Sequence, residues 1–152
     1  MYLASVSLFM FLLPIASILT EVIANKNHAA LITLMGKWFV FWAIGIRLFT
    51  AGVRQIVKPG LTSKGIFGIE GKEVWAIVRE LGFANTAMGL AGIISLWKPE
   101  WRLAVAFIGG LFLLLDGAQH IQSKQRNFEE NVAMYSDLFI GLVMAIFVIA
   151  RY

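Results

Sequence analysis

The sequence contains no cysteine and little charge, since Asp, Glu, Lys and Arg together make up 14% of the chain. Without thiols, disulfide frameworks, C-x-x-C redox motifs and thiolate-held iron–sulfur clusters are excluded. Only two histidines are present, His28 and His120, which are too few for a multi-histidine di-iron site. The net charge of +4 is scattered, and no basic block is interleaved with aromatic residues. Nothing therefore indicates a nucleic-acid partner.

Hydrophobic residues take the place of the missing charge. They make up 59% of the 152 residues, and the mean hydropathy is +0.78. A soluble domain is about half apolar and a quarter charged, so this composition predicts an integral membrane protein. A helix that crosses a bilayer needs about 20 apolar residues. Five such stretches occupy most of the chain, which leaves no room for a soluble catalytic domain.

We therefore predict one all-α domain over residues 1–152, a polytopic bundle of five transmembrane helices. The predicted helices cover about residues 1–21, 31–57, 73–97, 103–122 and 132–150. Residues 58–72 are predicted to form a loop; it is not a phosphate-binding loop, because Glu73 follows Gly71-Lys72 where Ser or Thr is required. We expect a multi-pass protein of the cytoplasmic membrane. Seven Lys and Arg residues near the N-terminal side against five on the other favour a cytoplasmic N-terminus.

Four of the five predicted helices carry ionisable residues at a similar depth. With a rise of about 1.5 Å per residue and helices that alternate in direction, Arg47, Glu80, Asp116 and Asp137 lie about 5 to 10 Å from the same membrane surface. His120 lies nearer that surface. The full set of predicted site residues is Arg47, Glu80, Asn85, Asp116, His120 and Asp137.

Small residues share the helix faces that carry these charges. Arg47 is in line with Ala43 and Ala51, and Asp137 is in line with Ala133 and Gly141. Such spacing lets helices approach closely, so the charged faces are predicted to point inward. A charge at a helix centre opposes insertion by about 2.5 to 3.5 kcal/mol, and folding alone does not require it. Ionisable residues within a membrane therefore indicate a functional site.

The third predicted helix carries two stripes of small residues. Glu80 lies in line with Ala84, Ala87 and Ala91, while the opposite stripe contains glycines and Asn85. This helix could be packed on both sides, either at the centre of the bundle or against a second copy of the chain in a homo-oligomer. The other expected partners are membrane lipids.

The favoured interpretation is a cavity that binds or translocates a small polar or amphiphilic molecule, or protons. Arg47 would hold an anionic group, Glu80 and Asp137 would balance charge or carry protons, and Asn85 would orient the ligand. No enzymatic reaction is indicated. Alternatively, Arg47 pairs with Glu80 or Asp137 only to hold the bundle together, which would make this a structural membrane interaction protein.

Asp116 and His120 are spaced one helical turn apart, which suits a pH-sensitive gate or proton relay in which the carboxylate fixes the imidazole tautomer. Together with Glu80 and Asp137 they could also ligate a metal. One histidine among carboxylates is a weak metal signal, so we predict no metal and no cofactor.

From Glu80 onward the chain resembles an uncharacterised family of small prokaryotic multi-helix membrane proteins, with looser similarity to DoxX-like proteins. The motifs that carry the resemblance are Glu80-Leu-Gly-Phe-Ala-Asn85, Gly117-Ala-Gln-His120, Glu130-Asn131 and Ser136-Asp137. DoxX-like proteins are associated with quinone-linked oxidation and mostly have four spans. The resemblance thus implies an alternative function as the membrane subunit of a redox system, with a quinone as cofactor and His120 as its hydrogen-bond donor.

Overall fold

The computed structural model describes residues 2–24, 30–122 and 126–151 and contains no strand within these ranges. His28, which lies in the segment 25–29, and residues 123–125 are outside these ranges. Five helical segments are long and apolar enough to cross a membrane. They are Tyr2–Ile23, Leu31–Val57, Lys72–Ile94, Pro99–Gln122 and Phe128–Arg151. The prediction of an all-α bundle with five spans is confirmed.

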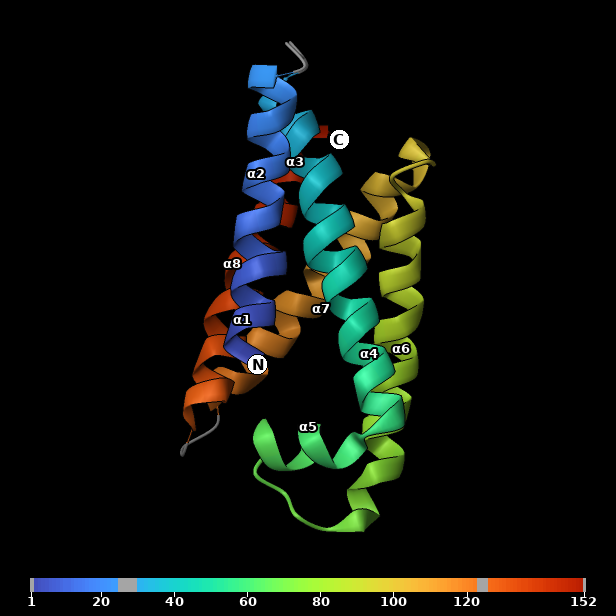
Figure 1. Cartoon of the computed structure of the whole chain (residues 1–152), viewed down its shortest axis with the longest axis vertical. Coiled ribbons are helices and arrows are strands. Elements are labelled where there is room, and N and C mark those ends of the chain that lie inside the picture. Colours follow the sequence, from blue (N-terminus) through green and yellow to red (C-terminus); the bar gives the residue numbers. More distant parts are fainter. Residues whose placement is uncertain (1, 25–29, 123–125, 152) are drawn as a thin grey trace.

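The described residues form eight α-helices, seven of which belong to the spans, with π-helical turns in the first two spans (Figure 1). The α-helices are α1 (Tyr2–Ser7), α2 (Leu13–Leu19), α3 (Leu31–Phe39), α4 (Arg47–Val57), α5 (Pro59–Gly65), α6 (Trp75–Ile94), α7 (Arg102–Gln122) and α8 (Phe128–Arg151). The π-helical segments are Leu8–Leu12, Thr20–Ala24 and Val40–Ile46. The last of these joins α3 to α4, so that the second span runs unbroken to Val57.

Two helix ends differ from the prediction because polar side chains cap them. The third span ends at Ile94 rather than at residue 97. Just after this end, the Arg102 side chain donates hydrogen bonds to the carbonyl oxygens of Ser95 (3.1 Å) and Leu96 (3.3 Å). α8 begins four residues earlier than predicted. The Asn127 side-chain oxygen accepts a hydrogen bond from the Glu130 backbone N–H (2.8 Å), as a helix N-cap does.

Glycines allow α4 and the preceding π-helical segment to pack closely against α6. A Cβ atom added to Gly92 would lie 2.7 Å from the Gly45 Cα, and one added to Gly82 would lie 2.9 Å from the Gly52 carbonyl oxygen. Neither position has room for a side chain. The glycine stripe of the third span is therefore its buried side, and the two backbones are in direct contact.

The first, fourth and fifth spans form a second group around one apolar core, together with α3 from the second span. α7 and α8 pack along their length, where Gly117 contacts Leu138 and Gly110 contacts Met144. The first span and α3 cover this pair. The core they share includes Met10, Leu34, Ile44, Leu113, Ile140 and Met144, each of which is almost fully buried.

The predicted loop 58–72 contains a helix, which corrects the sequence interpretation. α5 begins with Pro59, whose fixed φ suits a first helical position, and it buries Pro59 and Ser63. It runs crosswise under the ends of the longer helices (Figure 1). At this end of the bundle α4 and α6 separate from α7 and α8, and α5 lies beneath the space between them.

Candidate functional site

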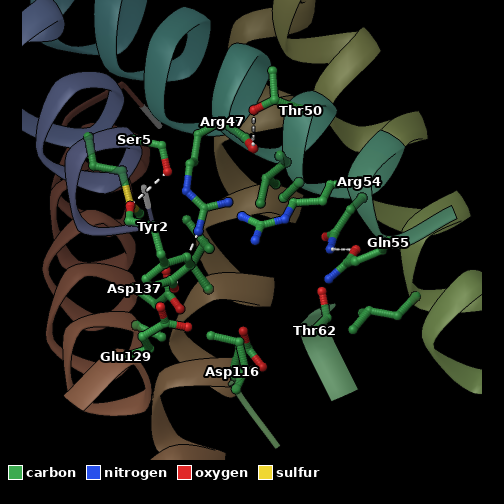
Figure 2. Close-up of a pocket in the computed structure, with 18 of the residues that line it drawn as sticks. Tyr2, Ser5, Arg47, Thr50, Arg54, Gln55, Thr62, Asp116, Glu129 and Asp137 are labelled. Carbon is green, nitrogen blue, oxygen red and sulfur yellow. Dashed lines mark hydrogen bonds between the residues drawn. The ribbon is translucent and has the colours of Figure 1, made fainter. Parts of the chain in front are cut away.

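A cavity of about 230 Å³ lies between the two helix groups, and residues of α5 line one side of it. The first span, α4, α5, α6, α7 and α8 all contribute to its wall (Figure 2). Much of the wall is apolar, with Phe9, Leu48 and Phe112 as examples. The ionisable residues that line it, apart from Tyr2, are Arg47, Arg54, Asp116, His120, Glu129 and Asp137. The structure therefore brings Arg47, Asp116, His120 and Asp137 to one place.

Arg47 is the first residue of α4, and its guanidinium extends into the cavity toward Tyr2 and Asp137 (Figure 2). One nitrogen donates a hydrogen bond to the Tyr2 hydroxyl (3.4 Å), and the guanidinium carbon lies 5.4 Å from the centre of the Tyr2 ring. The Arg47 Nε is buried and has no hydrogen-bond partner among the residues that the structure describes. None of the ion pairs among the described residues includes Arg47. The Arg47–Glu80 and Arg47–Asp137 pairs considered for a purely structural role are therefore not formed.

Asp116, His120 and Asp137 form a compact cluster on the α7–α8 side of the cavity. Each offers one ligand atom, and these atoms all lie within 4.8 Å of one another. Asp137 and His120 are buried, and Asp116 is partly exposed. Asp137 reaches the cavity from α8 because Ala133 and Gly141, one turn away on either side, lie on the same buried face.

The partner of His120 is Glu130 rather than Asp116. The Nδ1 of His120 and a carboxylate oxygen of Glu130 are 3.2 Å apart, and both side chains are buried. The prediction that Asp116 fixes the imidazole tautomer is therefore wrong. A carboxylate from the start of α8 does this, because Glu130 in the first turn of α8 lies against His120 in the last turn of α7.

Asn85 lies in the wall of the cavity, with only 4% of its surface exposed. Its amide nitrogen donates a hydrogen bond to the Gln55 side-chain oxygen (2.9 Å), which joins α6 to α4. Its own side-chain oxygen is buried and has no partner within the described part of the chain. Burial removes this oxygen from water, and no hydrogen bond from the described chain compensates for that loss of free energy. A hydrogen-bond donor on a ligand would compensate for it.

Glu80 does not belong to this group, which corrects the sequence prediction. It is exposed on α6 and absent from the cavity wall, as are Ala84 and Ala87 on the same face. α6 turns its glycine stripe toward α4, because Gly82 and Gly89 allow a closer approach than alanine does. The Glu80 face is left on the outside of the bundle.

Three site residues were missed by the sequence analysis. Tyr2 lies in the first predicted helix, which has no charged residue before Glu21, and Glu130 precedes the predicted start of the last helix at residue 132. Gln55 carried a usable signal, because it lies two turns from Arg47 on the helix face that also contains Ala51.

α5 closes the cavity from below and is held in place from both sides. Lys58 joins it to α4, and at the other end the Asn127 side-chain nitrogen donates a hydrogen bond to the Gly65 carbonyl oxygen (2.9 Å). Leu61, Thr62 and Ile66 face the cavity. Farther along the loop, an exposed hydrogen bond to Glu70 raises the pKa of the Lys64 ammonium and lowers that of the Glu70 carboxyl.

Asn127→Asp is expected to loosen α5 while leaving α8 intact. Aspartate keeps the oxygen that caps the helix but loses the amide donor to Gly65. The chain has no cysteine, so Ala51→Cys places a single thiol in the cavity wall. Loss of one hydrogen bond is expected to raise its modification rate by a water-soluble maleimide by roughly two- to tenfold. Asn131→Asp, which keeps the acceptor for Arg126, is the matched control. Equal rates in both variants would show that the Asn127 contact does not hold α5.

Taken together, these features define a class: an all-α, multi-pass membrane protein with ionisable residues around a cavity between two helix groups. Within this class, the chain belongs to a family of unknown function, DUF6790, whose sequence model matches residues 4–152. Comparison with curated proteins and with solved structures gives no match.

Proposed function

We propose that the protein binds a small polar or amphiphilic molecule through an acidic group that contacts Arg47. The observation that carries this proposal is the unsatisfied guanidinium. Arg47 carries five N–H donors, and among the described residues it makes one side-chain hydrogen bond, to the Tyr2 hydroxyl, while its buried Nε has no partner there. A planar guanidinium recognises carboxylate or phosphate with two parallel hydrogen bonds.

The remaining wall supports the same type of ligand. Arg54, two turns along the same side of α4, reaches the rim of the cavity and adds positive charge near Arg47 (Figure 2). The unpartnered oxygen of Asn85 and the two aspartates accept hydrogen bonds from hydroxyl or amide groups of the ligand. A volume of about 230 Å³ is small for a ligand pocket. It suits a small molecule or the head group of a larger amphiphile, whose chain would contact the apolar residues.

We further propose that α5 and the N-terminal end of the first span face the cytoplasm, at the cytoplasmic membrane of a prokaryote. The excess of Lys and Arg on this side and the family resemblance of the C-terminal half support this orientation and location. In this arrangement the ligand enters from the cytoplasmic leaflet or the cytoplasm, and α5 controls its access. Translocation would require a second opening on the other side of the bundle.

The test uses Ala51→Cys as a reporter in the purified full-length protein. Octyl phosphate is expected to protect the introduced thiol from maleimide, whereas uncharged octanol is not. Arg47→Lys keeps the charge but loses the planar fork, so half-protection is expected to need about tenfold more octyl phosphate, or about 1.4 kcal/mol. Lys98→Gln, which changes an exposed charge at the other end of the bundle, is the control.

Protection by octanol and octyl phosphate alike, or by neither, would contradict the proposal. The quinone alternative has its own signature, which is an ultraviolet absorption band in solvent extracts of the purified protein. Such a band, together with unchanged protection in Arg47→Lys, would favour the redox function.

A further inference from the structure

The charges buried beside the cavity do not balance. Glu130 and Asp137 are 8% and 6% exposed, and Asp116 is partly exposed. Arg47 is the buried-side cation that extends toward Asp137, while Arg54 and Glu129 are exposed at the rim and of opposite sign. With all three carboxylates ionised and His120 neutral, they would exceed the single guanidinium by two negative charges. Buried charge of this kind is strongly unfavourable unless it is paired, coordinates a metal or is neutralised by protons.

Asp137 is the carboxylate at which this excess of negative charge is located most clearly. It points into the cavity from α8 (Figure 2) and makes no hydrogen bond or ion pair with the part of the chain that the structure describes. One of its oxygens lies within 4.8 Å of a ligand atom of Asp116 and of one of His120, and those two atoms are also less than 4.8 Å apart. Metal bonds to imidazole and carboxylate are about 2.0 to 2.2 Å long, so each donor needs to move by less than about 1 Å to share one ion.

Glu130 provides an independent sign of a metal site. Its carboxylate lies 3.2 Å from the His120 Nδ1, which leaves Nε2 as the nitrogen available for a ligand. Histidines that bind metals almost always donate their other N–H to a carboxylate, a carbonyl or water, which fixes the ring and makes the ligating nitrogen more basic. A buried carboxylate–imidazole pair next to two aspartates reproduces this arrangement.

We propose that Asp116, His120 and Asp137 bind one divalent transition-metal ion, such as Zn²⁺ or Mn²⁺, and that Glu130 positions His120. One imidazole with two carboxylates matches the ligand preferences of these ions. The dication would neutralise the excess of two negative charges. Three protein ligands would also leave at least one coordination position for water or for a ligand in the cavity. This inference goes beyond the proposed function and does not require it.

The experiment uses the full-length protein in lipid nanodiscs, stripped with a chelator and titrated with Zn²⁺ in the absence of any amphiphile. Calorimetry and elemental analysis are expected to give one ion per chain. Co²⁺ is expected to bind competitively and to give a visible d–d spectrum that reports its ligands. Thermal unfolding of the unmodified protein should shift to higher temperature with Zn²⁺.

Three variants locate the ion. Asp137→Asn is expected to abolish stoichiometric binding, and Glu130→Gln is expected to weaken it by about 10- to 100-fold and to alter the Co²⁺ spectrum. Glu80→Gln removes an exposed carboxylate from α6 and is expected to bind Zn²⁺ as the unmodified protein does. If Asp137→Asn does not fold, the graded loss in Glu130→Gln tests the same site.

Failure of the unmodified protein to bind one Zn²⁺ or Mn²⁺ ion would overturn the inference and would mean that protons neutralise the carboxylates. Unchanged affinity in folded Asp137→Asn or Glu130→Gln would also overturn it, since the ion would then lie elsewhere. Protection by octyl phosphate in a protein that binds no metal would leave the proposed function standing and remove the metal site alone.

Discussion

Replacing Gly89 by alanine is expected to destabilise the bundle by about 3 kcal/mol, although it adds a single methyl group. A Cβ atom at this position would lie 2.7 Å from the Phe49 Cα and 2.8 Å from the Gly45 carbonyl oxygen. Both neighbours are backbone atoms, which cannot move aside as a flexible side chain does. The clash can be relieved only if α4 and α6 separate, which would also disturb the Gly45–Gly92 contact and the Asn85–Gln55 hydrogen bond.

Reversible unfolding of the purified protein in mixed micelles measures this loss. Ala87→Leu is the matched control, because it adds a larger group two residues away on the exposed face of α6. It is expected to change the free energy of unfolding by less than about 0.5 kcal/mol. If Gly89→Ala unfolds at the same denaturant concentration as the unmodified protein, the two helices are not in backbone contact.

Most of the fold could be predicted because the transmembrane signal is strong and local. Runs of about 20 apolar residues set the number of spans directly. The ends of α6 and α8 were harder, since they depend on side-chain caps: Arg102 caps the end of α6 across a turn, and Asn127 caps the start of its own helix, α8. α5 was missed for a related reason. Its seven residues include two glycines and a proline, a composition that predicts a loop. The helix is stabilised by the burial of Pro59 and Ser63 against the bundle.

The candidate site could be predicted in part, because the depth of a residue follows from its position along a helix. Depth correctly grouped Arg47, Asp116, His120 and Asp137. It placed Glu80 at the same level but could not decide which of two small-residue stripes on α6 faces inward. The glycine stripe does so, since the absence of Cβ atoms permits the closest contact of helices. A contact between the ends of two helices, such as that of Glu130 with His120, does not follow from depth along either helix.

Replacing Arg47 by methionine is expected to destabilise the metal-free protein by about 3 kcal/mol or more, because buried carboxylates lose their compensating cation. Methionine preserves most of the volume and fills the same space against Leu48 and Tyr2. The effect should depend on the aspartates. In the double variant Arg47→Met with Asp137→Asn, one uncompensated charge is gone, and part of the lost stability is expected to return. The coupling free energy between the two positions is expected to be about 1 to 3 kcal/mol.

The cycle is measured by unfolding in the presence of a chelator, so that no metal ion replaces the missing charge. Arg54→Met is the matched control, since it removes an arginine from the rim on the same side of α4 where the side chain is exposed. It is expected to change stability little and to show no coupling to Asp137→Asn. Because Arg47 forms no direct ion pair with Asp137, any coupling must act through the field inside a poorly hydrated cavity. Additive effects would mean that water fills the cavity and screens these charges, which would remove the electrostatic basis for both the ligand site and the metal site.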